Sequence, residues 1–159
     1  MNGVNVDANR IVSNSIYGPG QAYGVRIGDG DGNVVTNNPR VARHSSYGVY
    51  MDATAASNSV RGNAIFSNSI AGINLDGVDV DANRIVSNSI YGPGQNCGVF
   101  ITDGDGNAVT NNPRVARHDF YGVWMRRTAA SNVVSRNTIG SNRLAGIFVT
   151  NGSVNDNRF

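Results

Sequence analysis

The chain has 159 residues, a length that ordinarily forms one domain with a sizeable core. Its 13 basic residues are all Arg and its 11 acidic residues are all Asp, so the strong helix formers Lys and Glu are absent. The net charge of +2 is too small for a nucleic-acid-binding stripe, and no apolar run reaches membrane-spanning length, so we expect neither partner.

Asn and Gly, with 23 and 20 residues, supply over a quarter of the chain, and both suit tight turns. Val and Ile fill most aliphatic positions, whereas leucine occurs only at Leu75 and Leu144. Because β-branched residues favour strands, this composition predicts an all-β fold.

One pattern recurs with a period of 24 or 25 residues. Each unit opens with an Asn, carries a second Asn five residues later and continues to a Gly-aliphatic-x-aliphatic segment. Such a period predicts a solenoid in which each unit forms one coil. The opening residues are Asn9, Asn33, Asn58, Asn83, Asn107 and Asn132, and the glycines are Gly24, Gly48, Gly72, Gly98, Gly122 and Gly146.

In the first unit we expect strands around Ile11, around Ile16 and over residues 24–28, and later units repeat them in the same order. Strand alternation points the aliphatic side chains inward, where they would form one continuous core over residues 1–159. The Asn residues are expected at turns in the left-handed conformation, with amides hydrogen-bonded from coil to coil. The expected inward stacks are Val25, Ile27, Val49, Met51, Ile73, Leu75, Val99, Ile101, Val123, Met125, Ile147 and Val149; Ile11, Val35, Val60, Ile85, Val109 and Val134; and Ile16, Val41, Ile65, Ile90, Val115 and Ile139.

The repeat resembles that of right-handed parallel β-helices in the pectate-lyase-like superfamily. That group includes alginate epimerases, polysaccharide lyases, phage tailspikes and periplasmic copper-site accessory proteins. The resemblance covers practically the whole chain and implies a right-handed parallel β-helix of about six coils. It carries little information on function, because the pattern encodes coil packing. Leucine-rich repeats share the period but need several leucines in each unit.

Two outward rows on the glycine-led strands are candidates for a binding face, since that face lines the ligand groove in the enzymes of this superfamily. Aromatic rings next to arginine would form a platform for sugar rings and pair with a uronate carboxylate. The alternative is that these rings stabilise the sheet or are buried against another chain. The candidate ligand-binding residues are Tyr50, Phe100, Trp124, Phe148, Arg126 and Arg127.

Asp52 and Asp76 should be neighbours across one coil step and are the candidate metal ligands. Calcium held by stacked Asp residues is a feature of the pectate lyases that the chain resembles, although calcium prefers six to eight oxygens. The Asp-Gly-Asp-Gly-Asn segments at 29–33 and 103–107 resemble the start of a calcium loop, but they lack its closing Glu and are better explained as tight turns. We therefore expect no cofactor, with Ca²⁺ as the alternative.

Three further features are expected to lie at the surface. His44 and His118 follow Arg-Val-Ala-Arg in both halves of the chain and are expected as solvated turn residues. Cys97 is the only cysteine, so it forms no intrachain disulfide and is expected at a turn or on the surface. Four arginines, expected to be solvated, would form a basic stripe: Arg40, Arg43, Arg114 and Arg117.

Residues 6–79 and 80–153 are identical at 51 of 74 aligned positions, which indicates a recent duplication, natural or engineered. The first hypothesis for function is a noncatalytic scaffold or fragment that associates with itself, because neither end carries an evident cap. The second is a module that binds or processes polyuronates, as a lyase or epimerase does. That second function would place the protein outside the cell or in the periplasm, although no signal peptide opens the chain.

Overall fold

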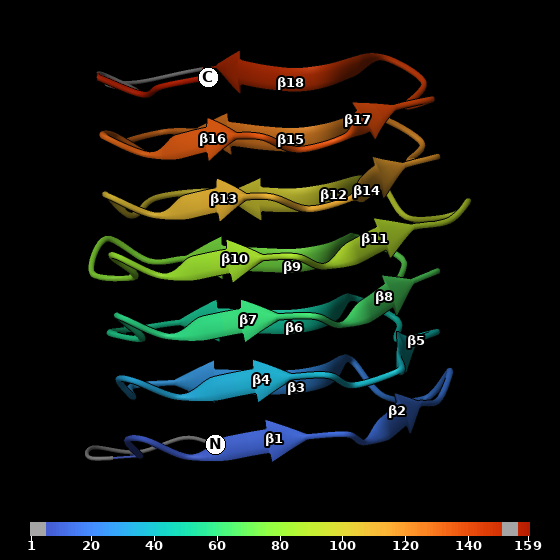
Figure 1. The fold of residues 1–159 in the computed structure, drawn as a ribbon, viewed down its shortest axis with the longest axis vertical. Helices are drawn as coiled ribbons and strands as arrows, with labels where there is room; N and C mark the ends of the chain where they lie inside the picture. The colour runs from blue at the N-terminus through green and yellow to red at the C-terminus, as the bar shows by residue number, and fades with distance from the viewer. Residues whose placement is uncertain (1–5, 151–155) are drawn as a thin grey trace.

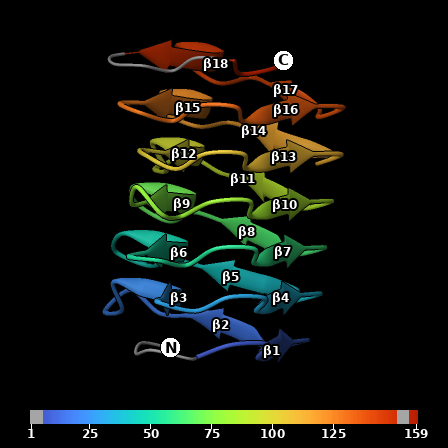
Figure 2. The ribbon, with the colours of Figure 1, turned by 90° about the vertical axis from the view of Figure 1, so that its left-hand side faces the viewer.

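The computed structural model describes residues 6–150 and 156–159, and within them it contains strands, turns and loops but no helix. The chain winds as a stack of coils along one axis (Figure 1). Each coil contributes one strand to each of three parallel sheets of six strands, and the side view separates the sheets (Figure 2). The predicted all-β solenoid of about six coils is confirmed.

Strands of one sheet recur at every third position in the chain. The first sheet contains β1 (Arg10–Val12), β4 (Val34–Thr36), β7 (Ser59–Arg61), β10 (Arg84–Val86), β13 (Ala108–Thr110) and β16 (Val133–Ser135). The second contains β2 (Ser15–Tyr17), β5 (Arg40–Ala42), β8 (Ala64–Phe66), β11 (Ser89–Tyr91), β14 (Arg114–Ala116) and β17 (Ile139–Gly140). The third contains β3 (Tyr23–Gly28), β6 (Tyr47–Asp52), β9 (Ala71–Asp76), β12 (Cys97–Ile101), β15 (Tyr121–Arg126) and β18 (Ala145–Thr150).

Aliphatic side chains from all three sheets form one core cluster that extends through the coils. The register pairs like with like, for example Ile85 with Val60 and Val109. The three predicted inward stacks are therefore confirmed, with their members in the end coils partly buried. The loops that join the third sheet to the first add Ala55, Val80 and Ala129 to this core.

Two rows of Asn side chains lie inside the coils, at the two bends that flank the first sheet. The first Asn row comprises the opening residues of the units, and the second comprises Asn14, Asn38, Asn63, Asn88, Asn112 and Asn137. In both rows, the backbone N–H of one Asn donates to Oδ1 of the next at 2.8–3.0 Å. The amide Nδ2 of Asn88 donates in turn to the carbonyl of Val60 in the preceding coil. The expected coil-to-coil bonding is confirmed.

The left-handed conformation lies one residue earlier than expected. Ala82 and Ser87, with φ of 53° and 56°, precede Asn83 and Asn88, and the same holds in the other coils. One residue of positive φ bends the chain, so the next side chain points inward. The expectation that the row Asn residues themselves adopt this conformation is therefore wrong.

In the first five coils, the glycine at the second position of each strand of the third sheet is required by space rather than by φ. A Cβ on Gly72 would lie 2.5 Å from Cγ2 of Ile90 and 2.9 Å from the carbonyl oxygen of Gly98. The bend into the third sheet brings the backbones of successive coils too close for a side chain at this position.

A third polar row, inside the bend between the second and third sheets, contains His44, Asn68, Gln95, His118 and Asn142. The Gln95 Oε1 accepts from the Asn68 backbone N–H at 3.2 Å, so its amide nitrogen faces Nδ1 of His118, also at 3.2 Å. His44 and His118 are 1% and 2% exposed, so the expectation that they are solvated turn residues is wrong. Burial lowers the pKa of both imidazoles, and that of His118 falls to about 4.

We predict that Asn88→Ala lowers the free energy of unfolding by about 3 kcal/mol, because it leaves the buried Asn63 N–H and Val60 carbonyl without partners. Asn14→Ala, in the exposed end position of the same row, should cost under about 1 kcal/mol. Urea unfolding followed by circular dichroism measures both. Equal losses for the two variants would contradict the role given to the buried row.

We also predict an acid-sensitive stability. The folded-state pKa of His118 lies below its unfolded value, so its neutral form stabilises the fold fully above about pH 6.5, and this contribution is lost as the pH falls toward 4. His118→Asn, which copies Asn68 and Asn142 of the same row, should flatten the decline. Urea titrations at pH 7, 5.5 and 4 test this, and an unchanged slope in the variant would assign the sensitivity to other groups.

Candidate functional site

The outer face of the third sheet carries the two rows that the sequence predicted. The outer aromatic row comprises Arg26, Tyr50, Asn74, Phe100, Trp124 and Phe148, and the register aligns its members from coil to coil. The outer charged row, two positions further along each strand, comprises Gly28, Asp52, Asp76, Thr102, Arg126 and Thr150.

A further outer row was missed. The outer tyrosine row comprises Tyr23, Tyr47, Ala71, Cys97, Tyr121 and Ala145, each directly before a row glycine. Strict alternation would put these residues inside, yet the Tyr23 ring stacks on that of Tyr50, 4.9 Å between centroids. The backbone bend at the glycine moves them outward, and the recurring Tyr-Gly pair was the signal that could have revealed this row.

Aromatic rings of neighbouring coils stack on one another, because the coil spacing of about 4.8 Å is close to a stacking distance. The rings of Phe100 and Trp124 are parallel within 9°, with centroids 4.5 Å apart, and Phe100 is only 7% exposed. The ring faces of Phe100 and Trp124 that meet are covered by one another. The expectation that they form an open platform for sugar rings is therefore wrong for those faces. The rings of Tyr121 and Phe148 form a second such stack at 4.5 Å.

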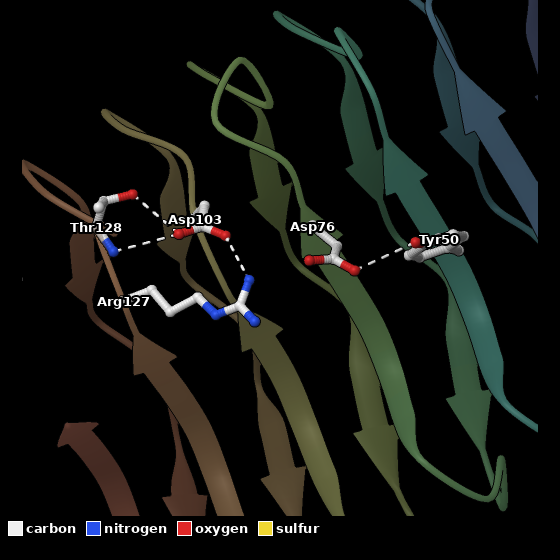
Figure 3. A network of polar contacts seen from close by, with 5 residues as sticks. All are labelled: Tyr50, Asp76, Asp103, Arg127 and Thr128. Carbon is white, nitrogen blue, oxygen red and sulfur yellow. Dashed lines mark hydrogen bonds and ion pairs between the residues drawn. The ribbon is translucent and has the colours of Figure 1, made fainter. Parts of the chain in front are cut away.

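The Arg126 guanidinium lies over this aromatic cluster, 4.9 Å from the ring centroid of Phe100 and 5.1 Å from that of Trp124. Within the described part of the chain, no carboxylate lies within ion-pair distance of Arg126. Arg127 differs, because its Nη1 lies 3.3 Å from Oδ2 of Asp103, whose other oxygen accepts from Thr128 (Figure 3). The two arginines are adjacent in sequence, but only Arg126 is stacked on the aromatic rings.

Asp52 and Asp76 are paired neighbours, as predicted. Asp52 is bound by Arg26 at 2.7 Å, and Asp76 accepts from the Tyr50 hydroxyl at 3.3 Å (Figure 3). Burial, followed by the charge of Asp76, raises the pKa of Tyr50. Among the described residues, no group of three or more His, Cys, Asp or Glu side chains could hold a metal ion. Calcium at this pair stays a prediction that would need oxygens beyond the two carboxylates.

The carboxylates of the Asp-Gly-Asp-Gly-Asn segments bind the backbone of neighbouring coils. Asp31 accepts from the Ala56 N–H at 3.0 Å, and Asp105 accepts from the Ala130 N–H at 2.8 Å. These bonds agree with the interpretation of both segments as tight turns.

Cys97 was expected at a turn or on the surface, but it lies in β12 and is 2% exposed. Burial raises the pKa of its thiol to about 12. It packs with Ala71 and Phe100 under the rings of the outer tyrosine row, so it is a small core residue of this face.

The expected basic stripe lies partly on the second sheet. Arg40 and Arg114 stack over the rings of Tyr17 and Tyr91, with distances of 3.8 and 4.0 Å to the ring centroids. These two arginines are half-buried rather than solvated, whereas Arg43 and Arg117 are exposed.

Asn74 is the one amide of the outer aromatic row, and it is 1% exposed. Neither its Oδ1 nor its Nδ2 makes a hydrogen bond of good geometry. The indole N–H of Trp124 and the Nε–H of Arg126 are also buried without a hydrogen-bond partner. Among the described residues, Asn33, Arg40, His44 and His118 also have buried polar atoms without a hydrogen-bond partner, but they lie away from this face.

The fold is shared with a solved enzyme. A crystal structure of a mutant of the periplasmic alginate epimerase AlgG superposes with a TM-score of 0.76 at 16% sequence identity. The match covers 94% of this chain and 35% of the epimerase chain. No curated protein matches the chain significantly. No helix in the described residues is long and apolar enough to span a membrane.

A family model described as "Periplasmic copper-binding protein (NosD)" matches residues 2–159. Copper prefers thiolate, thioether and imidazole ligands. Here His44 and His118 lie inside the bend between the second and third sheets, on coils separated by those of Asn68 and Gln95, whereas Cys97 lies on the outer face of the third sheet. The described side chains therefore do not fit a copper centre.

The family match extends over nearly the whole repeat array, and the coils that it covers form the continuous solenoid described above. The chain belongs to the NosD family of periplasmic copper-binding proteins.

Proposed function

We propose that this chain is a noncatalytic β-helix module that binds an acidic polysaccharide, of the polyuronate class, along the outer face of its third sheet. The observation that carries the proposal is the set of buried polar groups without partners on that face, at Asn74, Trp124 and Arg126. Unpaired buried donors and acceptors cost free energy, and a ligand that supplied the missing hydrogen bonds would recover part of that cost.

Arg126 supports an acidic ligand. Its guanidinium is oriented by two aromatic rings and has no carboxylate of the described chain beside it. A planar guanidinium held in this way is suited to pair with a carboxylate through two hydrogen bonds. A uronate polymer presents such a carboxylate on every sugar unit.

The repeat of the face supports a polymer rather than a small ligand. Equivalent positions recur about every 4.8 Å along the stack, which is close to the length of one hexose unit. Tyr50, Phe148 and the exposed Arg127 extend the face on either side of Arg126. The solved epimerase with this fold is named for alginate, a polymer of the same class.

Binding without turnover agrees with where the titratable groups lie. Asp52 and Asp103 are paired with arginines, and both imidazoles lie inside the coils. The raised pKa of Tyr50 makes its hydroxyl a poor general base. Since the family is described as periplasmic, we place this module in the periplasm or outside the cell.

Self-association through the same aromatic face is the competing function, and it makes a different prediction. A face that binds a second copy of the chain would give a mass that rises with concentration, and oligo-uronates would leave that mass unchanged. Sedimentation velocity with and without an oligo-uronate separates the two functions.

We predict that Arg126→Ala weakens binding of oligo-uronates about tenfold to hundredfold, because a hydrogen-bonded charge contributes about 1.5–3 kcal/mol. Arg84→Ala makes the same charge change at an exposed position of the first sheet and should bind as the wild type does. Titration calorimetry with oligo-uronates and with a neutral oligosaccharide of equal length measures both. The absence of heat from every uronate with the wild type would overturn the proposed function.

A further inference from the structure

The centre of the outer face contrasts with its two ends. In the outer aromatic row, Asn74 stands between Tyr50 and Phe100. In the outer tyrosine row, the small residues Ala71 and Cys97 stand between Tyr47 and Tyr121. The sheet therefore carries small side chains in its middle coils and large rings on either side.

The Tyr47 ring covers part of this central region of small side chains. It packs against the cluster of Ala71, Cys97 and Phe100. Its hydroxyl lies beside the Asn74 amide, although that amide makes no hydrogen bond of good geometry. Asn74 itself is only 1% exposed. Burying an amide without hydrogen bonds of good geometry is unfavourable. In the closed arrangement, the Asn74 amide can therefore still gain hydrogen bonds from a ligand.

We propose that Asn74 is the floor of a sugar subsite, closed in the free protein by Tyr47 and opened when one unit of the polymer displaces that ring. This inference rests on the proposed function and assigns a residue and a regulation to the same face. The Asn74 amide offers a donor and an acceptor side by side, which matches a sugar hydroxyl that both accepts and donates.

The dimensions of the subsite fit one sugar ring. Tyr50 and Phe100 lie on strands two spacings apart, about 10 Å, which is wide enough for one sugar once the Tyr47 ring has moved away. Arg126 lies two coil steps beyond Asn74 along the stack. A uronate chain following the stack would thus place one sugar on Asn74 while a carboxylate further along reaches Arg126.

Two variants separate this subsite from a structural role of Asn74. Asn74→Leu replaces an unsatisfied amide with an apolar side chain, so it should raise the melting temperature by about 2–4 °C and weaken oligo-uronate binding at least tenfold. Asn68→Leu is the matched control, since it removes a buried amide that is hydrogen-bonded, and it should lower the melting temperature. Tyr47→Ala removes the cover and should strengthen binding several-fold, because the competent state is then populated without ligand.

The outcomes are distinguishable by calorimetry and by the side-chain amide resonance of Asn74 in NMR spectra. Loss of affinity in Asn74→Leu, gain in Tyr47→Ala and a shift of that resonance on adding an oligo-uronate support the subsite. A wild type that binds, together with an Asn74→Leu variant of equal affinity, overturns the subsite and leaves the proposed function standing. No binding of any oligo-uronate by the wild type overturns the proposed function and the subsite together.

Discussion

The fold depends on the hydrogen bonds that inward-pointing amides make from coil to coil. At each bend around the first sheet, a backbone N–H leaves the sheet ladder and would be buried without a partner. The Oδ1 of the Asn in the next coil accepts it, and the Nδ2 of that Asn binds a carbonyl in the preceding coil. The bends can therefore close around a buried core, which allows three short strands per coil to enclose it.

The same coil spacing governs the outer face. Side chains at equivalent positions of successive coils lie within contact distance. Aromatic rings therefore stack, and charges pair, between neighbouring strands along the axis of the stack. This arrangement orients Arg126 on Phe100 and Trp124, and it closes the ring faces that an isolated aromatic residue would offer. The function that we propose for this face rests on the Asn74 amide, the Trp124 indole N–H and the Arg126 Nε–H, which are buried without a hydrogen bond of good geometry.

Much of this organisation could be predicted from the repeat, since a pattern of period 24 or 25 predicts both the coil and its inward side chains. The sequence wrongly predicted Cys97 and the two histidines at the surface, because each occupies a position that other coils fill with a different residue. The place of His118 is fixed by Asn68 and Gln95 in other coils. A polar residue in a turn-like segment gives no sign that it points inward, so burial had to come from the structure.

The sequence by itself determined the all-β solenoid, the three aliphatic stacks, the Asn rows and the order of the outer residues along each strand, because all of these follow from spacing along the chain. The tertiary structure decided the left-handed residue before each Asn and the outward turn at the row glycines. It also decided which arginine stacks on the rings and which amide is buried without a hydrogen bond of good geometry. Those features depend on contacts between residues about 24 positions apart, where backbone bends of a few residues set the direction of a side chain.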